Sequence, residues 1–228
     1  RETAYPGIKE KLANDEVIPV PLSTYETVVL ICANRGAKFS RLVLGGVKSY
    51  VTQDFMTRAP VVEARDAAQA LELSEYINNN FDVLQDVAES TTNHGKVREI
   101  KSYQIGNDVY VRLLMHSGEA SGHNMTTKAG TALVRYLVEK FAGMEYGSDS
   151  GNMCADKKAA AINAITGRGK TVITEIAIPR EACKQYLKTT PEALEKLNIK
   201  KNLQGSIAAG SQFSANAHFA NIIGAMYV

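Results

Sequence analysis

Apolar and polar residues alternate with a period of two in the middle of the chain. The alternation covers residues 97–105 (VREIKSYQI) and 108–116 (DVYVRLLMH), and it is interrupted by the turn residues Gly106 and Asn107. A period of two is typical of a half-buried strand, and an Asn or Gly pair between two such runs favours a hairpin. The pattern therefore predicts two antiparallel strands joined by a tight turn.

Helical spacing of apolar residues surrounds this hairpin in the sequence. Residues 66–90 precede it with apolar positions at helical intervals, and residues 123–143 follow it and stop at a glycine. A short apolar strand is predicted at residues 60–65. The order strand, helix, strand, strand, helix predicts a small ferredoxin-like domain over residues 60–147.

The segments on either side of this domain predict a second, larger domain of residues 1–59 and 148–228, so that the small domain is an insertion. The fold class expected is α+β. The predicted elements of the larger domain are strands at 17–22 and 26–34, a break at Gly45-Gly46, a helix from Asp156, a strand at 171–179, a helix capped by Thr189 or Thr190 with Pro191 in its first turn, and a C-terminal helix at 214–228. Because the chain starts with Arg1 and its last helix lacks a stop signal, we expect the intact protein to be longer.

Composition narrows the class of protein. The 228 residues are 45% hydrophobic and 22% charged, with a formal net charge of +2, so no nucleic-acid partner is expected. The cysteines Cys32, Cys154 and Cys183 lack metal-ligand spacing and favour a reducing compartment. No run is apolar enough for a membrane span, and the expected location is cytoplasmic.

Charge is unusually placed in the segment SGNMCADKKAAAIN, residues 150–163. Asp156 is predicted to cap a helix and to hold one lysine, which places Lys157 and Lys158 in the first turn. Cations are disfavoured at a helix N-terminus unless an anion lies there. The segment therefore predicts an anion site, although two solvated surface charges would be the simpler interpretation.

Five other features each have a structural and a functional interpretation. GRGKT resembles the end of a phosphate-binding loop, but Ala164 stands where that loop needs glycine, so a simple turn is favoured. The segment 116–125 is either a plain strand-to-helix turn or a pyrophosphate site. Glu26 is either an edge carboxylate or, if buried, a proton donor. Arg58 is either a surface residue or an anion fork, and His218 with Asn221 form either a satisfied core pair or a functional face.

Taken together, the motifs resemble the 3-hydroxy-3-methylglutaryl-coenzyme A (HMG-CoA) reductase family. The segment SGNMCADKKAAAINAITGRGKTVITEIAIP is similar to that family's SGNxCxDKKxxAIN…GRGK…E…IP pattern, and KNLQGSIAAGSQFSANAHFANIIGAMY to its KNLxGSxxAGS…NAHxANIxxAxY pattern. STYETVVLICANRG, MTRAPVV and GEASGHNM resemble three further family blocks in the same order. The DKK block resembles the class shared by eukaryotes and archaea.

The resemblance implies an enzyme that reduces the HMG-CoA thioester to mevalonate with two hydrides from NADPH, or alternatively NADH, without a metal. It implies a large acyl-CoA domain, an inserted small dinucleotide domain, and a homodimer or dimer of dimers with shared active sites. The location implied is the cytoplasm, or the cytosolic side of a membrane where an N-terminal anchor is present. A catalytically impaired, reductase-like acyl-CoA-binding protein is the alternative.

The resemblance also implies residue roles. Glu26 would donate a proton and Lys157 would stabilise the oxyanion. The residues implied for substrate binding are Arg58, Ser150, Asp156, Lys158, Lys201, His218, Asn221, Asn34 and Arg35. The residues implied for cofactor binding are Glu119, Ala120, Ser121, Gly122, His123, Asn124, Asn152, Asn79 and Asn80.

Some positions depart from the family pattern. Glu119 replaces an aspartate, Ser121 and His123 stand where methionines are common, Thr27 replaces a glycine and Cys32 a serine. The family's catalytic aspartate and histidine would lie beyond Val228, and its N-terminal dimerisation segment is not found. The stretch expected near a 2′-phosphate, residues 78–80, carries no cation and favours NADH, whereas the DKK class favours NADPH. Lys96, Arg98 or Lys101 could supply the cation instead.

Overall fold

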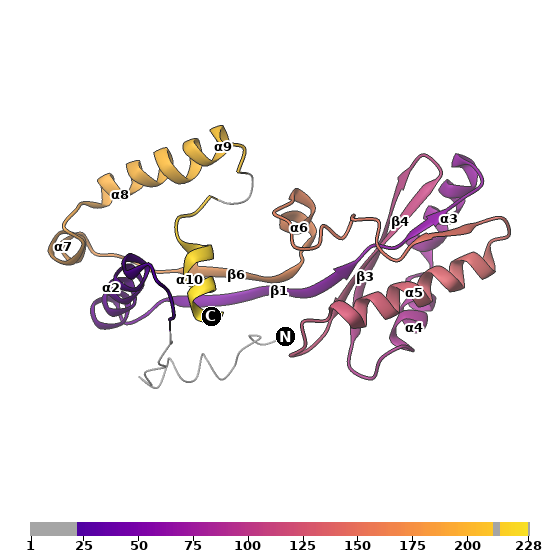
Figure 1. Ribbon diagram of the computed structural model, residues 1–228, viewed down its shortest axis with the longest axis horizontal. Helices are drawn as coiled ribbons and strands as arrows, with labels where there is room; N and C mark the ends of the chain where they lie inside the picture. The colour runs from indigo at the N-terminus through magenta and orange to yellow at the C-terminus, as the bar shows by residue number, and fades with distance from the viewer. Residues whose placement is uncertain (1–21, 212–214, 228) are drawn as a thin grey trace. The chain divides into compact units, whose positions relative to one another are not determined.

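The structure is a computed structural model that describes residues 22–211 and 215–227 (Figure 1). Contacts divide the chain into two compact units. The first comprises the described residues up to Thr52 and those from Val172 onwards, and the second is Gln53–Thr171. Helices and an antiparallel sheet are both present, which confirms the predicted α+β class. The strand predicted at 17–22 lies almost wholly outside the described residues.

The second unit is built on an antiparallel sheet. Strands β2 (Val61–Glu63), β3 (Lys96–Ile105), β4 (Asp108–His116) and β5 (Glu145–Ser148) lie in the order β5-β2-β4-β3. The end of β1 (Lys48–Arg58) pairs with β4 beside β2. This strand order, with helices between β2 and β3 and between β4 and β5, is the predicted ferredoxin-like arrangement.

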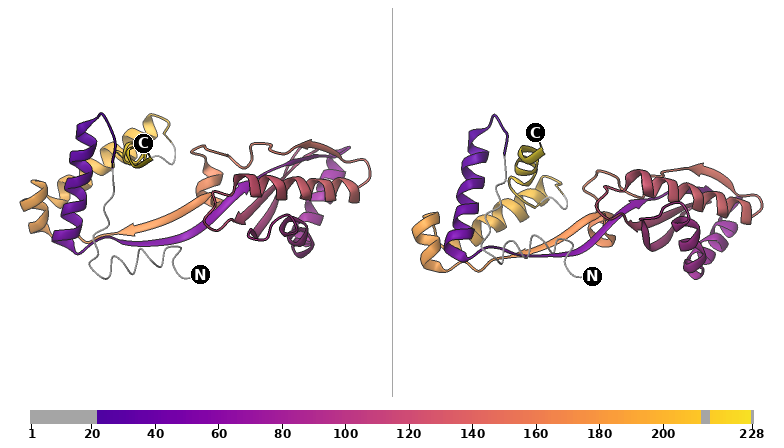
Figure 2. Two further views of the ribbon diagram at one scale, coloured as in Figure 1. Left: turned by 60° about the horizontal axis from the view of Figure 1, so that its bottom comes forward. Right: turned by 90° about the horizontal axis from the view of Figure 1, so that it is seen from below.

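Three helices of the second unit pack on this sheet, namely α3 (Ala67–Asn79), α4 (Phe81–Glu89) and α5 (His123–Lys140) (Figure 2). Asp66 caps α3 by accepting a hydrogen bond from the Gln69 amide at 2.8 Å, as expected for a helix start. The apolar sides of helices and sheet form one core. It includes Val62, Ala70, Leu73, Ile77, Leu84, Ala88, Val97, Ile100, Val109, Val111, Leu113, Met115, Ala129, Leu133, Val134 and Leu137.

Strand β4 separates this core from the opposite face of the sheet. Side chains of a strand alternate between faces, and Val111 and Leu113 belong to the helix-side core. Arg112, between them, is fully buried on the other side, where it donates a hydrogen bond to the Gly167 carbonyl at 2.9 Å. The segment that follows β5 therefore covers the sheet face opposite the helices. With this packing, the second compact unit extends to Thr171.

In the first unit, the segment expected as a strand at 26–34 is a helix. Helix α2 (Thr27–Leu44) buries Val29 and Phe39, which lie close to three helical turns apart on one side. The β-branched residues at its start favour a strand locally, but burial of this face decides the structure. The break predicted at Gly45-Gly46 is confirmed, because Gly45 ends the helix in the left-handed conformation with φ 72°.

The remaining elements of the first unit follow β6 (Gly169–Glu175). Thr190 caps α8 by accepting a hydrogen bond from the Ala193 amide at 3.2 Å, with Pro191 in the first turn as predicted. The described part of the C-terminal helix contacts α2. These elements are α7 (Arg180–Ala182), a π-helical turn η1 (Cys183–Leu187), α8 (Pro191–Asn198), a π-helical turn η2 (Ile199–Gly205), α9 (Ser206–Ala208) and α10 (Phe219–Tyr227).

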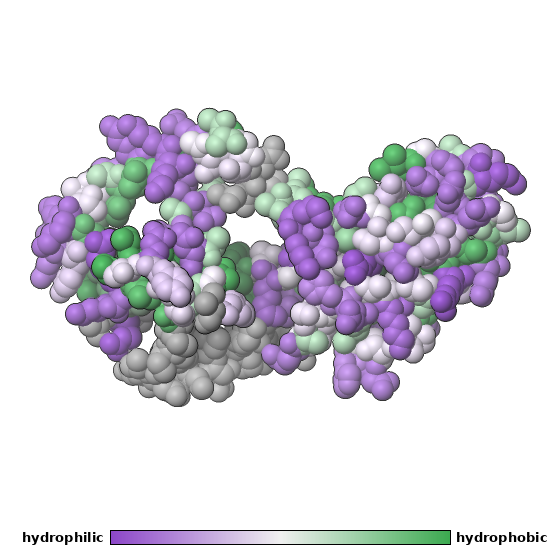
Figure 3. All heavy atoms as spheres, viewed as in Figure 1, coloured by the Kyte–Doolittle hydropathy of each residue, from purple (hydrophilic) through white to green (hydrophobic). Residues whose placement is uncertain are grey.

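The two units differ in how their surfaces are composed. The visible face of the second unit is mostly hydrophilic, with scattered hydrophobic residues (Figure 3). The first unit exposes many large apolar side chains, among them Val28, Ile31, Val172, Ile173 and Ile207. Across residues 22–211 and 215–227, no helix combines the length and apolar character that a bilayer crossing requires.

Candidate active site

The segment Ser150–Lys158, called here the DKK loop, is folded into turns. Helix α6 (Ala161–Thr166) begins only after it, so Asp156 is not a helix cap and the two lysines are not in a first helical turn. Asn152, Ala155 and Lys157 have positive φ angles of 61°, 46° and 57°. A helix cannot run through such residues, and this is why the predicted helix start is wrong.

Contacts within the second unit hold the DKK loop against the sheet. The Gly151 amide donates to the Ala59 carbonyl at 2.7 Å, and the Thr57 hydroxyl donates to the Cys154 carbonyl at 3.2 Å. A Cβ at Gly151 would lie 2.5 Å from the Tyr110 ring, so only glycine allows this approach. The Asn163 side chain closes the loop from α6 by donating to the carbonyls of Ala155 and Lys158, each at 2.9 Å.

A second loop, Ser117–Gly122, leads from β4 into α5 and is called here the glycine loop. The Ser117 hydroxyl donates to the Ala120 carbonyl at 2.6 Å, and the Gly118 amide donates to His116 Nδ1 at 3.4 Å. Gly122 precedes the helix with φ 82°, and a Cβ there would lie 2.6 Å from Ser117 Oγ. The first amides of a helix have no acceptor within it, so the start of α5 offers donors to an anion.

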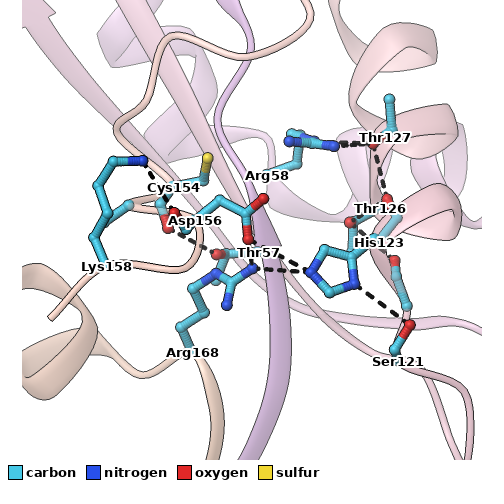
Figure 4. Close-up of polar contacts among 12 residues, drawn as sticks. Thr57, Arg58, Ser121, His123, Thr126, Thr127, Cys154, Asp156, Lys158 and Arg168 are labelled. Atoms are coloured by element: carbon cyan, nitrogen blue, oxygen red, sulfur yellow. Dashed lines mark hydrogen bonds and ion pairs between the residues drawn. The ribbon is translucent and has the colours of Figure 1, made fainter. Parts of the chain in front are cut away.

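Asp156 links the two loops (Figure 4). Its carboxylate accepts a hydrogen bond from Arg168 Nη2 and lies 3.5 Å from His123 Nε2, while Nδ1 of His123 lies 3.4 Å from the Ser121 hydroxyl. Burial alone would raise the pKa of Asp156, but the neighbouring cations outweigh burial and lower that pKa below its ordinary value. Arg168 contributes most among them, ahead of Lys157 and Arg58. Asp156 therefore remains an anion at neutral pH.

The expected pairing of Asp156 with a lysine is wrong for the carboxylate. Lys158 Nζ donates to the backbone carbonyl of Asp156 at 3.0 Å, and the carboxylate is bonded to Arg168 instead. The turns of the DKK loop explain this difference, because they aim the Asp156 side chain toward Arg168 and His123 (Figure 4). Lys157 and Lys158 remain exposed.

Arg58, Ser150 and Cys154 form the other side of the same cluster. The Arg58 guanidinium donates from Nε to the Thr127 hydroxyl at 2.9 Å, and the Ser150 hydroxyl lies 3.4 Å from Cys154 Sγ. Burial would raise the pKa of the Cys154 thiol, but hydrogen bonds from Ser150 and the Asp156 amide, together with the charge of Arg58, lower that pKa overall. The surroundings of Cys154 therefore favour a negatively charged group at this position.

Several predicted residues lie on the two loops and others do not. Glu119, Ala120, Ser121 and Asn124 are exposed on or next to the glycine loop, and Asn152 is exposed on the DKK loop. Asn79 and Asn80 lie instead at the junction of α3 and α4, in the helical layer on the other side of the sheet. There the side-chain amide of Asn80 donates to the Tyr76 carbonyl at 2.9 Å.

The remaining predicted residues belong to the first unit. Glu26 is exposed immediately before α2, so the burial considered for it is not observed in the described chain. His218 has φ 77° and precedes α10, with its Nδ1 3.4 Å from the side-chain amide of Asn221. The other three, Asn34, Arg35 and Lys201, are exposed on α2 and on η2.

Sequence reasoning missed Thr127, Arg112 and Arg168. Arg168 lies in the GRGK segment, which was predicted as a turn, and this prediction is confirmed because α6 ends at Thr166 and β6 begins at Gly169. The glycines on either side of Arg168 were the only indication in the sequence that the backbone directs its side chain. Nothing in the local sequence marks Arg112 or Thr127, since their partners are distant in the chain.

The second unit thus combines a ferredoxin-like sheet with two loops that meet at one carboxylate among several cations, which is the arrangement of a protein that binds anionic ligands. The family model described as hydroxymethylglutaryl-coenzyme A reductase matches residues 8–228, and the chain belongs to this family.

Curated relatives support this assignment. The chain is 45% identical over 210 residues to the 3-hydroxy-3-methylglutaryl-coenzyme A reductase of Methanothermobacter thermautotrophicus, covering 92% of this chain and 52% of the relative. It is 41% identical to the reductase of Pyrococcus abyssi, covering 51% of that protein, and 40% identical to reductase 1 of Arabidopsis thaliana, covering 36%. The chain therefore spans about half the length of the archaeal relatives.

A solved structure shares the fold. The class II 3-hydroxy-3-methylglutaryl-CoA reductase of Streptococcus pneumoniae, bound to NADPH in open conformations, matches with a TM-score of 0.58 at 19% identity. The match covers 91% of this chain and 58% of that one. At this identity the likeness supports the fold alone.

Proposed function

We propose that the intact protein is an HMG-CoA reductase that converts the HMG-CoA thioester to mevalonate. The nicotinamide cofactor supplies two hydrides: the first reduces the thioester to an aldehyde and releases coenzyme A, and the second reduces the aldehyde to an alcohol. The observation that carries the proposal is the meeting of the DKK loop and the glycine loop at Asp156, Arg168 and His123 in a member of this family.

The two loops have separate roles in this proposal. Arg58, Ser150 and Lys158 hold the negatively charged HMG portion, because a fixed guanidinium and an ammonium favour a carboxylate. Lys157 lies beside them and stabilises the negative charge that forms on the carbonyl oxygen as hydride arrives. The amides at the start of α5 hold the cofactor pyrophosphate. Glu26, Asn34, Arg35, Lys201, His218 and Asn221 supply the proton donor and the contacts to coenzyme A from the larger domain.

NADPH is the cofactor that we propose. Lys96 and Lys101, two of the cations considered for a 2′-phosphate, are engaged by Glu89 at 2.7 Å and by Glu99 at 2.5 Å. An open groove along α5 instead presents two further cations, and it is lined by Thr91, Lys128, Thr131, Ala132, Arg135, Tyr136 and Glu139. Cations on the helix whose first turn would hold the pyrophosphate favour an additional phosphate on the same ligand.

The assembly that we propose is a homodimer or a dimer of dimers that acts in the cytosol, with a larger acyl-CoA domain of residues 1–59 and 148–228 and a small dinucleotide domain of residues 60–147. Many large apolar side chains are exposed on the first unit, which supports the burial of part of this surface in the proposed oligomer. Light scattering on the intact protein tests the oligomer, and a monomer at micromolar concentration would contradict it.

The decisive experiment is to incubate the intact protein with HMG-CoA and either NADPH or NADH. We expect mevalonate, detected by mass spectrometry, with two moles of cofactor oxidised per mole formed, and a higher kcat/KM with NADPH. Arg135→Met should reduce the preference for NADPH, whereas Lys101→Met should leave it unchanged. A folded protein that binds HMG-CoA but oxidises neither cofactor would instead be the acyl-CoA-binding alternative.

A further inference from the structure

The GRGK segment has a geometry that the proposed roles do not use. Gly167 and Gly169 have φ angles of 86° and 72°, in the left-handed region that favours glycine. A Cβ at Gly167 would also lie 2.7 Å from the Gln53 side-chain oxygen. Two glycines therefore fix the direction in which Arg168, the residue between them, leaves the backbone.

Arg168 serves both loops with one nitrogen. Its Nη2 donates to the Asp156 carboxylate in the DKK loop and lies 3.2 Å from His123 Nε2 at the end of the glycine loop (Figure 4). The nitrogen carries two hydrogens, so it can bond to both acceptors at once when His123 carries its proton on Nδ1, the nitrogen that faces Ser121. With 12% of its side chain exposed, Arg168 is shielded from competing water.

A second arginine, Arg112, is hydrogen-bonded to the backbone of the GRGK turn. Arg112 is fully buried and donates from Nη2 to the Gly167 carbonyl at 2.9 Å, while its Nε and Nη1, like Nε of Arg168, have no hydrogen-bond partner within the described chain. A buried guanidinium with unsatisfied donors is costly. Burial and, to a smaller extent, the charge of Arg168 lower the pKa of Arg112. Two such groups side by side point to a positional role, because they do not stabilise the core.

We propose that Arg168 is a positioning residue that couples the two loops, so that a ligand bound at one loop strengthens binding at the other. Arg112 fixes the turn from which Arg168 extends. A ligand that orders the glycine loop places His123, and through Arg168 it also places Asp156, so the second ligand meets a loop that is already arranged. Such coupling is reciprocal by thermodynamic necessity. The identity of the two ligands, a nicotinamide dinucleotide and HMG-CoA, rests on the proposed function.

The first test measures the dissociation constant of NADPH for the intact protein with and without saturating HMG-CoA. We expect HMG-CoA to tighten NADPH binding by about 5-fold or more in the wild type, and this ratio to fall close to one in Arg168→Met. Arg168→Lys keeps the charge but lacks the fork, and should give an intermediate ratio. Arg65→Met, at an exposed arginine paired with the adjacent Asp66, is the matched control. An unchanged ratio in Arg168→Met, or a wild-type ratio of one, overturns the coupling.

The second test needs neither ligand. The carboxyl carbon of Asp156 is followed by NMR during a pH titration of the wild type, Arg168→Met and Arg65→Met. Because Arg168 is the largest contributor among the charges that lower the pKa of Asp156, its removal should raise that pKa, and the control should not change it. An unshifted midpoint in a folded Arg168→Met protein overturns the positioning role. A shifted midpoint in a protein that binds neither ligand would support the positioning role and contradict the proposed function.

Discussion

Lys157 shows how a single residue can be placed by strain. Its φ of 57° is uncommon for a residue with a side chain and is maintained by the turns on either side of it. The resulting backbone leaves the ammonium group exposed at the edge of a cluster that contains Asp156, Arg58 and Arg168. The Lys157 ammonium group is therefore available to a ligand, because it forms no ion pair within the second unit.

Replacement of Lys157 tests its role in the chemistry. If the intact protein has the proposed reductase activity, we expect Lys157→Ala to lower its kcat by about 10²–10³-fold, because removal of one group that stabilises a developing oxyanion has this size of effect. The thermal unfolding midpoint should change little. Lys188→Ala is a matched control, since Lys188 is also an exposed lysine with positive φ, 55°, but lies at the end of η1. Turnover similar to wild type in Lys157→Ala would show that another group carries the charge.

At the scale of elements, predictions succeeded where a local pattern and the tertiary structure agreed. The hairpin around Gly106-Asn107 and the helix after the glycine loop were predicted because alternation and helical spacing were unbroken over many residues. Helix α2 was mistaken for a strand because its β-branched start has the composition of one. The helix start predicted at Asp156 is wrong because the turns of the DKK loop depend on contacts with Thr57 and Ala59, which are distant in the sequence.

For the candidate site too, the sequence identified residues but did not identify their partners from distant parts of the chain. The resemblance to the family selected Asp156, Arg58 and His123, which the structure brings into one cluster. Reasoning from the local sequence assigned Asp156 the wrong partner, because the position of Arg168 is set by the sheet and by two left-handed glycines. Asn79 and Asn80, which the resemblance assigns to the cofactor, lie in the helical layer, and that assignment stays a prediction.

The junction of α4 and β3 gives a pH-dependent prediction. Glu89 accepts hydrogen bonds from Lys96 Nζ at 2.7 Å and from the Val97 amide at 2.9 Å. Burial opposes ionisation of Glu89, but these donors, together with Gln85, outweigh it and lower the pKa of Glu89 below 4.5. The lowered pKa adds stability that is fully present above the unfolded value of 4.5 and is lost as pH falls through the folded pKa.

We therefore expect Glu89→Gln to reduce the free energy of unfolding at pH 7 by about 1.5–3 kcal/mol, the usual range for hydrogen bonds to a charged group. The difference from wild type should shrink as the pH falls below 4.5. Denaturant titrations from pH 7 to pH 3 measure it, with Glu72→Gln, an exposed position on α3, as the control. A difference independent of pH would mean that the ionised carboxylate does not stabilise this junction.

At the scale of the whole chain, burial is distributed unequally between the two units. Among the described residues, the buried apolar side chains of the first unit are Val29, Phe39, Ala182, Cys183 and Ala225, whereas the second unit has a continuous core. Local stability follows the density of buried apolar contacts. The second unit should therefore hold its structure more persistently than the first.

Hydrogen exchange on the 228-residue chain checks this difference. We expect the slowest amides in β4 and α5, which contribute most to the core, and faster exchange throughout α8, which has no buried residue. The reason is that exchange in the core requires opening of the whole unit, whereas α8 can open locally. Equal protection of α8 and β4 would contradict the inequality.

Because residues of β4 alternate between two faces, the position of a one-codon insertion or deletion determines whether the fold tolerates it. Odd-numbered residues such as Val111 pack against the helices, and even-numbered ones such as Arg112 support the loops on the other side. Deletion or insertion of one codon within the strand would exchange the two sets, because each later residue would turn to the opposite face. Arg112 would enter the apolar core in either case. Val111 would face Gly167 after an insertion before Val111, and Leu113 would face it after a deletion before Arg112. The same change at the Gly106-Asn107 tip, outside both sets, would leave each residue of β4 on its own face.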